Sequence, residues 1–296
     1  MSDNKSSPSC LTWKKLPQMK DPILLMGFHG WPNAGSVSSE TLLYLIEVLK
    51  PKHIAGFDEE SFLNYAIDRP IAEIEDGIIH EFDSCVSELL YWENTDGEHD
   101  LVLFLGKEPS FRWNAYTSIF IDVMSKLHVR RLFTIGGVQD SISHSSKALV
   151  TVVGSSIAAL EDTTQLGYGV QPAEYYGPVS IHSRLVNACA DSGIDAISFW
   201  GHVPAYLQKS PRIVARIVGI LNRLVGMRCP LDILEQKSVE LDRKIDEAMA
   251  KDPNLQQFVQ SMETGKPQVN LRGKKIIRLD DFVKRDHSRD YRDYED

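Results

Sequence analysis

The chain has 296 residues, 43% hydrophobic and 25% charged, a composition ordinary for a folded globular protein. Its formal net charge of −9 argues against a general affinity for nucleic acid. The first residues lack the apolar core of a signal peptide, and the most apolar late stretch, residues 212–234, carries four arginines and a proline. We therefore expect a cytoplasmic protein without a membrane partner, in which the four scattered cysteines are free thiols.

Apolar segments alternate with amphipathic segments from residue 21 to about residue 227. Uninterrupted apolar strands separated by helices are typical of a mostly parallel sheet that is covered on both faces, so the predicted fold class is α/β. Strands are expected at 22–28, 53–58, 101–106, 131–137, 149–155 and 195–201, and helices at 34–50, 112–127, 180–192 and 211–225. Residues 71–93 read as a short antiparallel meander with a turn at Asp76-Gly77.

The chain divides into four predicted regions. Residues 1–20 form a polar, disordered tail, and residues 21–228 form the α/β core. Residues 229–264 are a helical extension packed on its own domain or on a neighbour, with one helix at 235–251 and a shorter one to about Met262. Residues 265–296 are a mixed-charge tail predicted to be disordered, so truncation after Met262 should leave the melting temperature and the oligomer mass nearly unchanged.

A glycine-rich turn, "GFHGWPNAGSV", follows the first apolar strand. Gly30 and Gly35 have the spacing of a P-loop, but Ser36 and Val37 stand where that loop needs a lysine and a Ser/Thr. We expect no ATPase activity, with Asn33 as the cap of a helix that begins near Ala34. Free N–H groups at that helix start would favour an anion. A tight turn in which the glycines serve steric needs is the stronger interpretation.

No complete catalytic constellation is recognisable, and neither a cofactor nor a metal is predicted. His29, His144, His182 and His202 are too dispersed in sequence to have metal-ligand spacing, although loops could bring them together. Carboxylates that follow strands (Asp58, Glu59, Glu60 and Glu108) could flank a pocket, but a solvated strand end explains them at least as well.

Two aromatic and basic segments lie at strand ends. "EPSFRW" combines Glu108, Arg112 and Trp113, and a Glu108–Arg112 pair would order that loop. "WGHVPAYL" places His202 and Tyr206 before a helix. Either segment can line a ligand pocket or an oligomer interface, and we favour the interface. The complete set of candidate residues is Gly30, Trp31, Asn33, Gly35, Glu108, Arg112, Trp113, Gly137, His144, His182, His202 and Tyr206.

Five phrases occur in the order of the proteasome assembly chaperone family, and the chain resembles its bacterial branch. They are "GFHGWPNAGSVSSETLLYL", "FLNYAIDRP", "HDLVLFLGKEPSFRW", "TIGGVQDSISHS" and the long run that starts "YYGPVSIHSRLVNACADSGIDAISFWGHVPAYL". The resemblance spans residues 21–262 and implies a three-layer α/β/α fold of the phosphorylase/hydrolase-like type, a homotrimer and a C-terminal helical extension. Relatives have also been labelled ATP-grasp enzymes, and nothing in these residues supports that label.

The sequence departs from the family pattern in two places. Asn33 stands where aspartate is common, which removes a charge but keeps capping ability. Some archaeal relatives dock on proteasomes through a terminal motif with tyrosine as the last residue but one, whereas Tyr294 is third from the end here. The sequence thus favours a non-catalytic, homo-oligomeric assembly or scaffolding factor that binds a protein such as a proteasome-like assembly. The alternative is a binding protein for a small anionic or nucleoside-like molecule, or a hydrolase/phosphorylase-like enzyme, that uses a pocket at the carboxyl ends of the strands.

Overall fold

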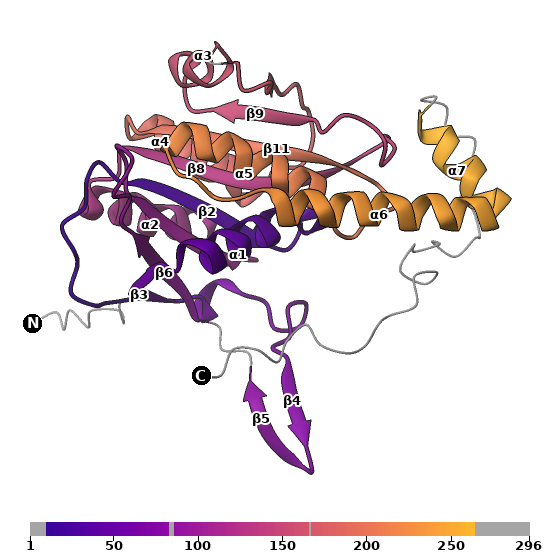
Figure 1. Cartoon of the computed structure of the whole chain (residues 1–296). Helices are drawn as coiled ribbons and strands as arrows, with labels where there is room; N and C mark the ends of the chain where they lie inside the picture. The colour runs from indigo at the N-terminus through magenta and orange to yellow at the C-terminus, as the bar shows by residue number, and fades with distance from the viewer. Residues whose placement is uncertain (1–9, 83–85, 166, 264–296) are drawn as a thin grey trace, which may run out of the picture.

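The computed structural model describes residues 10–82, 86–165 and 167–263, and the predicted tail after residue 264 lies outside these ranges. Nine strands form one sheet in the order β1-β3-β6-β7-β2-β8-β11-β9-β10 (Figure 1). Their bounds are β1 Leu11–Trp13, β2 Ile23–His29, β3 Lys52–Asp58, β6 Val86–Trp92, β7 Leu101–Lys107, β8 Arg131–Asp140, β9 Val150–Gly154, β10 Gln171–Pro172 and β11 Asp195–Pro204. Strands β4 (Ala72–Glu75) and β5 (Ile78–Phe82) form a separate two-stranded sheet.

The centre of the large sheet is parallel. Strands β7, β2, β8 and β11 are neighbours and run in the same direction, while β3 and β6 on one side and β9 on the other run antiparallel to their inner neighbours. Side chains of β2 alternate between the two faces, with Ile23 and Leu25 in one buried cluster and Leu24 and Met26 in the other. Burial on both faces explains why this strand is continuously apolar.

Helices cover both faces and make three layers. Their bounds are α1 Val37–Leu49, α2 Trp113–Leu127, α3 Ile157–Gln165, α4 Ile181–Asp191, α5 Pro211–Val225, α6 Asp232–Lys251 and α7 Pro253–Glu263. Leu45 of α1 and Ile217 of α5 pack on one face of the sheet, whereas Phe120 of α2 and Leu185 of α4 pack on the other. The predicted three-layer α/β fold is confirmed, and α6 adds the C-terminal helical extension by packing along α5 (Figure 1).

The β4–β5 hairpin extends away from the body (Figure 1). Asp76 and Gly77 have φ angles of 51° and 79°, the two consecutive positive values that a type I′ turn requires. The predicted turn is therefore correct. The predicted meander is wrong in its third strand, because β6 pairs with β3 and β7 in the large sheet rather than with the hairpin.

Three other boundaries differ from the sequence predictions. Disorder was predicted for all of residues 1–20, but β1 pairs antiparallel with β3 from Leu11 onward. The prediction is therefore wrong for the part of this segment that includes β1. Helix α1 begins at Val37 rather than near Ala34, because Gly35 and Ser36 have positive φ angles that interrupt the α-helix after a short 3₁₀ turn. Strand β10 and helix α3 were not predicted.

Candidate functional site

The loops that carry the candidate residues lie at one edge of the sheet. They follow β2, β7, β8 and β11, whose carboxyl ends are adjacent in the parallel centre. In doubly wound folds this edge is where ligands are bound. The residues predicted for a pocket nevertheless separate into a glycine turn, a carboxylate-filled helix start and three histidine groups.

The glycine turn is packed against the body, and several of its backbone groups are already hydrogen-bonded. Gly35 has a φ of 59°, and a Cβ there would lie 2.6 Å from Cγ1 of Val203. The N–H of Gly137 donates to the carbonyl of Pro32 at 2.8 Å, and a Cβ on Gly137 would lie 2.1 Å from the carbonyl oxygen of Ala34. Gly137 therefore permits close backbone packing between the turn and β8, and Gly35 permits close packing on Val203 of β11, as the steric interpretation predicts.

The side chain of Asn33 reaches the first turn of α1. Its Oδ1 accepts from the N–H of Ser39 at 3.1 Å, and its Nδ2 donates to Oγ of Ser39 at 2.9 Å. Asn33 also forms an isolated parallel bridge to Gly137. The N-cap residue of α1 is Ser36, and Asn33 precedes the 3₁₀ turn Ala34–Ser36 without a side-chain cap bond to it. The predicted N-cap at Asn33 is therefore wrong in position, although its side chain still supplies an acceptor to the N–H of Ser39 in the first turn of α1.

A carboxylate of the protein itself occupies the start of α4. Oε1 of Glu108 accepts from the N–H of Ile181 at 2.9 Å, and the N–H of Trp31 also bonds to this side chain. Burial raises the pKa of Glu108, and these N–H donors act in the opposite direction. The anion-binding capacity of this helix terminus is used internally.

Arg112 and Trp113 serve the same loop in different ways. The guanidinium of Arg112 lies 5.5 Å over the ring of Phe62, so the hypothesised pairing with Glu108 is replaced by a cation–π contact. The Nε1 of Trp113 donates to the carbonyl of Pro109 at 2.6 Å. Trp113 therefore fixes the loop to the first turn of α2.

His182 is completely buried and its two ring nitrogens have no hydrogen-bond partner. Its ring centroid lies 5.2 Å from that of Phe28 and 5.2 Å from that of Trp200. Desolvation lowers the pKa of His182 to about 3, so the imidazole is neutral at physiological pH. His182 is a core residue between two aromatic side chains.

His144 and Tyr206 form a second group, which joins the β8–β9 loop to α6. Nδ1 of His144 lies 2.9 Å from Oη of Tyr206, and Nε2 lies 3.1 Å from Oδ1 of Asp246. The backbone N–H of His144 also donates to Oη of Tyr206 at 2.8 Å. The loop is thereby attached to the helical extension.

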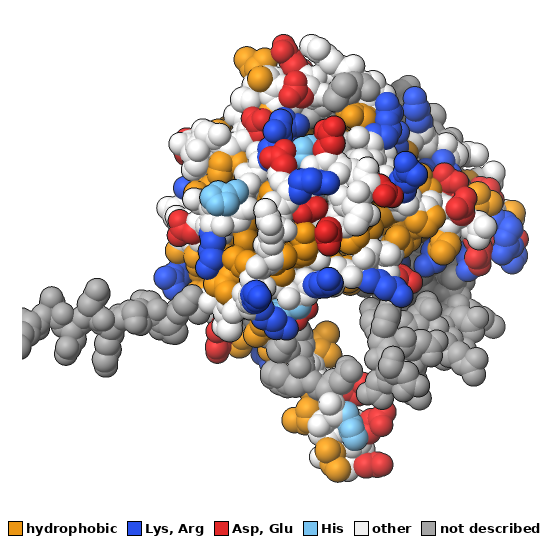
Figure 2. Space-filling model, turned by 60° about the vertical axis from the view of Figure 1, so that its left-hand side comes forward, with side chains coloured by type: hydrophobic (Ala, Val, Ile, Leu, Met, Phe, Trp, Pro, Cys, Tyr) orange, Lys and Arg blue, Asp and Glu red, His pale blue; other side chains and the backbone are white. Residues whose placement is uncertain are grey.

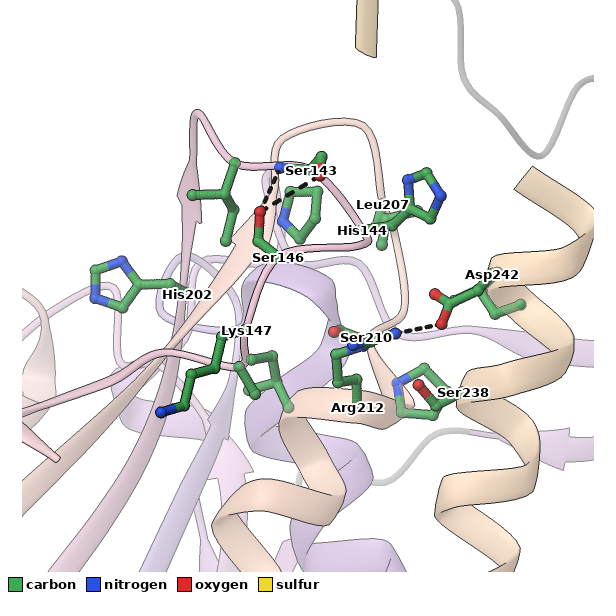
Figure 3. Close-up of a pocket in the computed structure, with 16 residues that line it drawn as sticks. Ser143, His144, Ser146, Lys147, His202, Leu207, Ser210, Arg212, Ser238 and Asp242 are labelled. Atoms are coloured by element: carbon green, nitrogen blue, oxygen red, sulfur yellow. Dashed lines mark hydrogen bonds and ion pairs between the residues drawn. The ribbon is translucent and has the colours of Figure 1, made fainter. Parts of the chain in front are cut away.

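His202 belongs to a third group. Its Nδ1 lies 2.8 Å from Oδ2 of Asp140, and its Nε2 lies 3.1 Å from Oγ1 of Thr151. A cavity of about 20 Å³ lies nearby, lined in part by His202, Ser146, Arg212 and residues of α6 (Figure 3). That volume has room for about one water molecule and not for a nucleotide.

Glu59 is the buried functional group that sequence reasoning undervalued. It is only 2% exposed, not solvated as a strand-end carboxylate would be. Oε2 accepts from Oγ of Ser87 at 2.8 Å and from the N–H of Lys107 at 3.3 Å, and Oε1 accepts from Oη of Tyr116 at 3.3 Å. Desolvation raises the pKa of Glu59 to about 7, although the three hydrogen-bond donors act to lower it. The signal in the sequence was its position directly after β3.

Within residues 10–82, 86–165 and 167–263, no three His, Cys, Asp or Glu side chains converge as metal ligands. No helix in those ranges is both long and apolar enough to cross a bilayer.

Comparison with known proteins gives a consistent result. The PAC2 family profile matches residues 27–249. A Streptomyces avermitilis PAC2 family protein is 26% identical, with a TM-score of 0.68 over 77% of this chain and 95% of its own. A Mycobacterium tuberculosis proteasome-assembly chaperone homologue is 25% identical, with a TM-score of 0.71 over 80% and 99%. The Pyrococcus furiosus proteasome activator PbaB shares the fold at 17% identity, with a TM-score of 0.64 over 80% and 97%. No functionally curated protein gives a significant match.

Proposed function

This chain is a member of the PAC2 family, and we propose that it acts as a homo-oligomeric assembly or scaffolding factor in the cytoplasm, without catalytic chemistry of its own. Its partner in this proposal is another protein, such as a proteasome component. Two similar structures support a protein of this class as the partner: one is a proteasome-assembly chaperone homologue and the other a proteasome activator.

One observation carries the proposal: the edge of the sheet that holds ligands in related architectures is filled by the protein's own groups. Glu108 occupies the start of α4, and the turn at Gly35 is closed by Val203. Large apolar side chains nevertheless remain at the surface beside this edge, with Trp31 61% and Phe111 50% exposed. Exposed aromatic side chains of this kind favour contact with a protein.

The test begins with the mass of the purified protein. Static light scattering at micromolar concentration should give a homotrimer, about three times the 33.4 kDa of one chain. A mass near 33.4 kDa would remove the oligomeric part of the proposal.

The second part of the test concerns the partner. The tagged chain is expressed at its native abundance, cross-linked in the cell and purified. Mass spectrometry should then find one other protein bound to it in a fixed stoichiometry. The purified partner should then reach its assembled state faster when this chain is added, as followed by native electrophoresis. An unchanged assembly rate would contradict the chaperone role.

A second candidate function rests on the hydrogen-bonded array of Asp140, His202 and Thr151. An acid, an imidazole and a hydroxyl in that order resemble the arrangement that activates a nucleophile in hydrolases. If this array is catalytic, the protein should hydrolyse a p-nitrophenyl ester, and His202→Ala should abolish the turnover. Equal background rates for the wild type and the variant would exclude this candidate.

A further inference from the structure

The β4–β5 hairpin has an unusual surface. We call residues 71–80 the arm. Its isoleucines are all exposed, between 59% and 76%: Ile71, Ile74, Ile78 and Ile79. The two strands form a sheet of their own, and Figure 2 shows apolar and acidic side chains side by side on the hairpin. Large β-branched side chains in this number are not expected on a projection that stays in water.

The arm also needs support. A two-stranded hairpin alone is only marginally stable in water, and three strands or a packed face are required for independent stability. The exposed isoleucines show that the described part of its own subunit, residues 10–82, 86–165 and 167–263, does not give the arm this support. A surface on another molecule would supply the missing support.

The charge of the arm restricts what that surface can be. Glu73, Glu75 and Asp76 are exposed, and residues 71–80 contain neither lysine nor arginine. Two arms facing each other would place like charges together as they buried their isoleucines, which is unfavourable. The covering surface should be apolar and carry positive charge.

Such a surface lies beside the filled strand ends. We call it the crest and define it by exposed Trp31, Phe111 and Val179 with the cations Arg112 and Arg184. Glu108 holds its parts together, because its carboxylate accepts from the backbones of Trp31 and Ile181.

The cations of the crest are held in place. Arg112 is exposed and lies over Phe62, and Arg184 donates twice to Oδ1 of Asn114, at 3.1 and 2.8 Å. The ring of Phe62 and the amide of Asn114 are uncharged, so neither contact neutralises the positive charge of the guanidinium. The crest therefore offers aromatic side chains and two ordered cations to an acidic, isoleucine-rich partner.

We infer that the arm of one copy packs on the crest of the next copy. Arm and crest are different surfaces, so the contact is heterologous, and repeating it around a rotation axis closes a ring. This inference rests on the proposed self-association and specifies which surfaces produce it. The occupant of the crest is a second copy of this chain.

The first test compares single apolar substitutions by light scattering. Ile74→Asp in the arm and Phe111→Asp in the crest should each reduce the oligomer to monomer at micromolar concentration. Ile233→Asp is the matched control, because Ile233 on α6 is also a half-exposed isoleucine outside both surfaces. Circular dichroism and thermal melting should show that all three variants are folded.

The second test exchanges the charges. Glu73→Arg with Glu75→Arg should weaken association at least tenfold, as should Arg112→Glu with Arg184→Glu, and combining all four should recover most of the wild-type mass. The inference is overturned if the arm and crest variants keep the wild-type mass, or if only Ile233→Asp dissociates. A monomeric wild type would instead overturn the self-association on which it rests, so the two failures are distinguishable.

Discussion

The carboxylate of Glu108 and the N–H of Ile181 are 2.9 Å apart, although the two residues are 73 positions apart in the chain. A loop after β7 thus supplies the negative charge that the start of α4 favours. This contact explains why the glycine-rich edge of the sheet offers no free helix terminus to a phosphate group at α4.

Replacing Glu108 by Ala should lower the free energy of unfolding by about 1–2 kcal/mol, because the helix start loses a charged acceptor. Glu108→Gln should cost less, since its amide oxygen can still accept. Urea denaturation measures both. Sulfate should stabilise Glu108→Ala more than the wild type, because the freed N–H groups can bind an anion. An alanine variant as stable as the wild type would show that this contact is not stabilising.

His182 should make the protein sensitive to acid. Its pKa is about 3 in the folded chain, against an ordinary value of 6.5 for an exposed histidine, so folding favours the neutral ring. Its stabilising contribution is complete above pH 6.5 and is lost as the pH falls from 6.5 toward 3. When the pH is lowered from 7 to 5, the free energy of unfolding of His182→Leu should fall by about 2 kcal/mol less than that of the wild type.

Urea denaturation at both pH values checks the His182 prediction. His128→Asn, which removes an exposed imidazole outside the arm and keeps a residue type that tolerates the φ of 54° there, is the control for the loss of a histidine elsewhere. Parallel pH profiles for His182→Leu and the wild type would contradict a neutral, desolvated His182.

Glu59 should make the protein less stable at alkaline pH, the opposite of the acid sensitivity expected from His182. Its pKa is raised from 4.5 to about 7, so folding favours the protonated carboxyl group. Its stabilising contribution is complete below pH 4.5 and is lost as the pH rises through 7. Between pH 5 and pH 8, the wild type should lose about 2 kcal/mol more stability than Glu59→Gln. Glu60→Gln, at an exposed neighbour, is the control, and equal losses in Glu59→Gln and the wild type would refute the shift.

Gly35→Ala should destabilise the fold by about 2–4 kcal/mol, since it adds both a positive-φ penalty and a clash with Val203. Gly193→Ala separates the two effects. Gly193 has a φ of 69° and open space around it, so alanine there should cost only about 1 kcal/mol. Gly35→Ala combined with Val203→Ala should lose the clash but not the backbone strain. Equal costs at the two glycines would show that Val203 does not limit the turn.

The sequence predicted the core well because apolar periodicity reports burial directly. Strand β2 and helix α5 lie where their patterns placed them. Periodicity does not report strand direction, so the antiparallel course of β9 was not expected. Helix α3 was missed because only Ala159 and Thr163 are buried in it, which leaves a weak amphipathic signal.

The candidate site could be predicted only in part, because strand ends locate an edge but not the side chains that fill it. The sequence brought Glu108 and the glycine turn to the right edge. It did not indicate that His144 contacts Asp246, a residue 102 positions later on the helical extension. It also treated Glu59 as a solvated residue, although aromatic and backbone donors from distant elements enclose it.

The last strand of the sheet limits how copies of this protein can be joined. Strand β10 has only two residues and ends in Pro172, which has no N–H to donate to an incoming strand. Addition of a further strand at this border is therefore blocked. At high protein concentration, strands of other copies should therefore not add to the sheet at β10. Assembly through side-chain surfaces then does not compete with fibre formation at this edge.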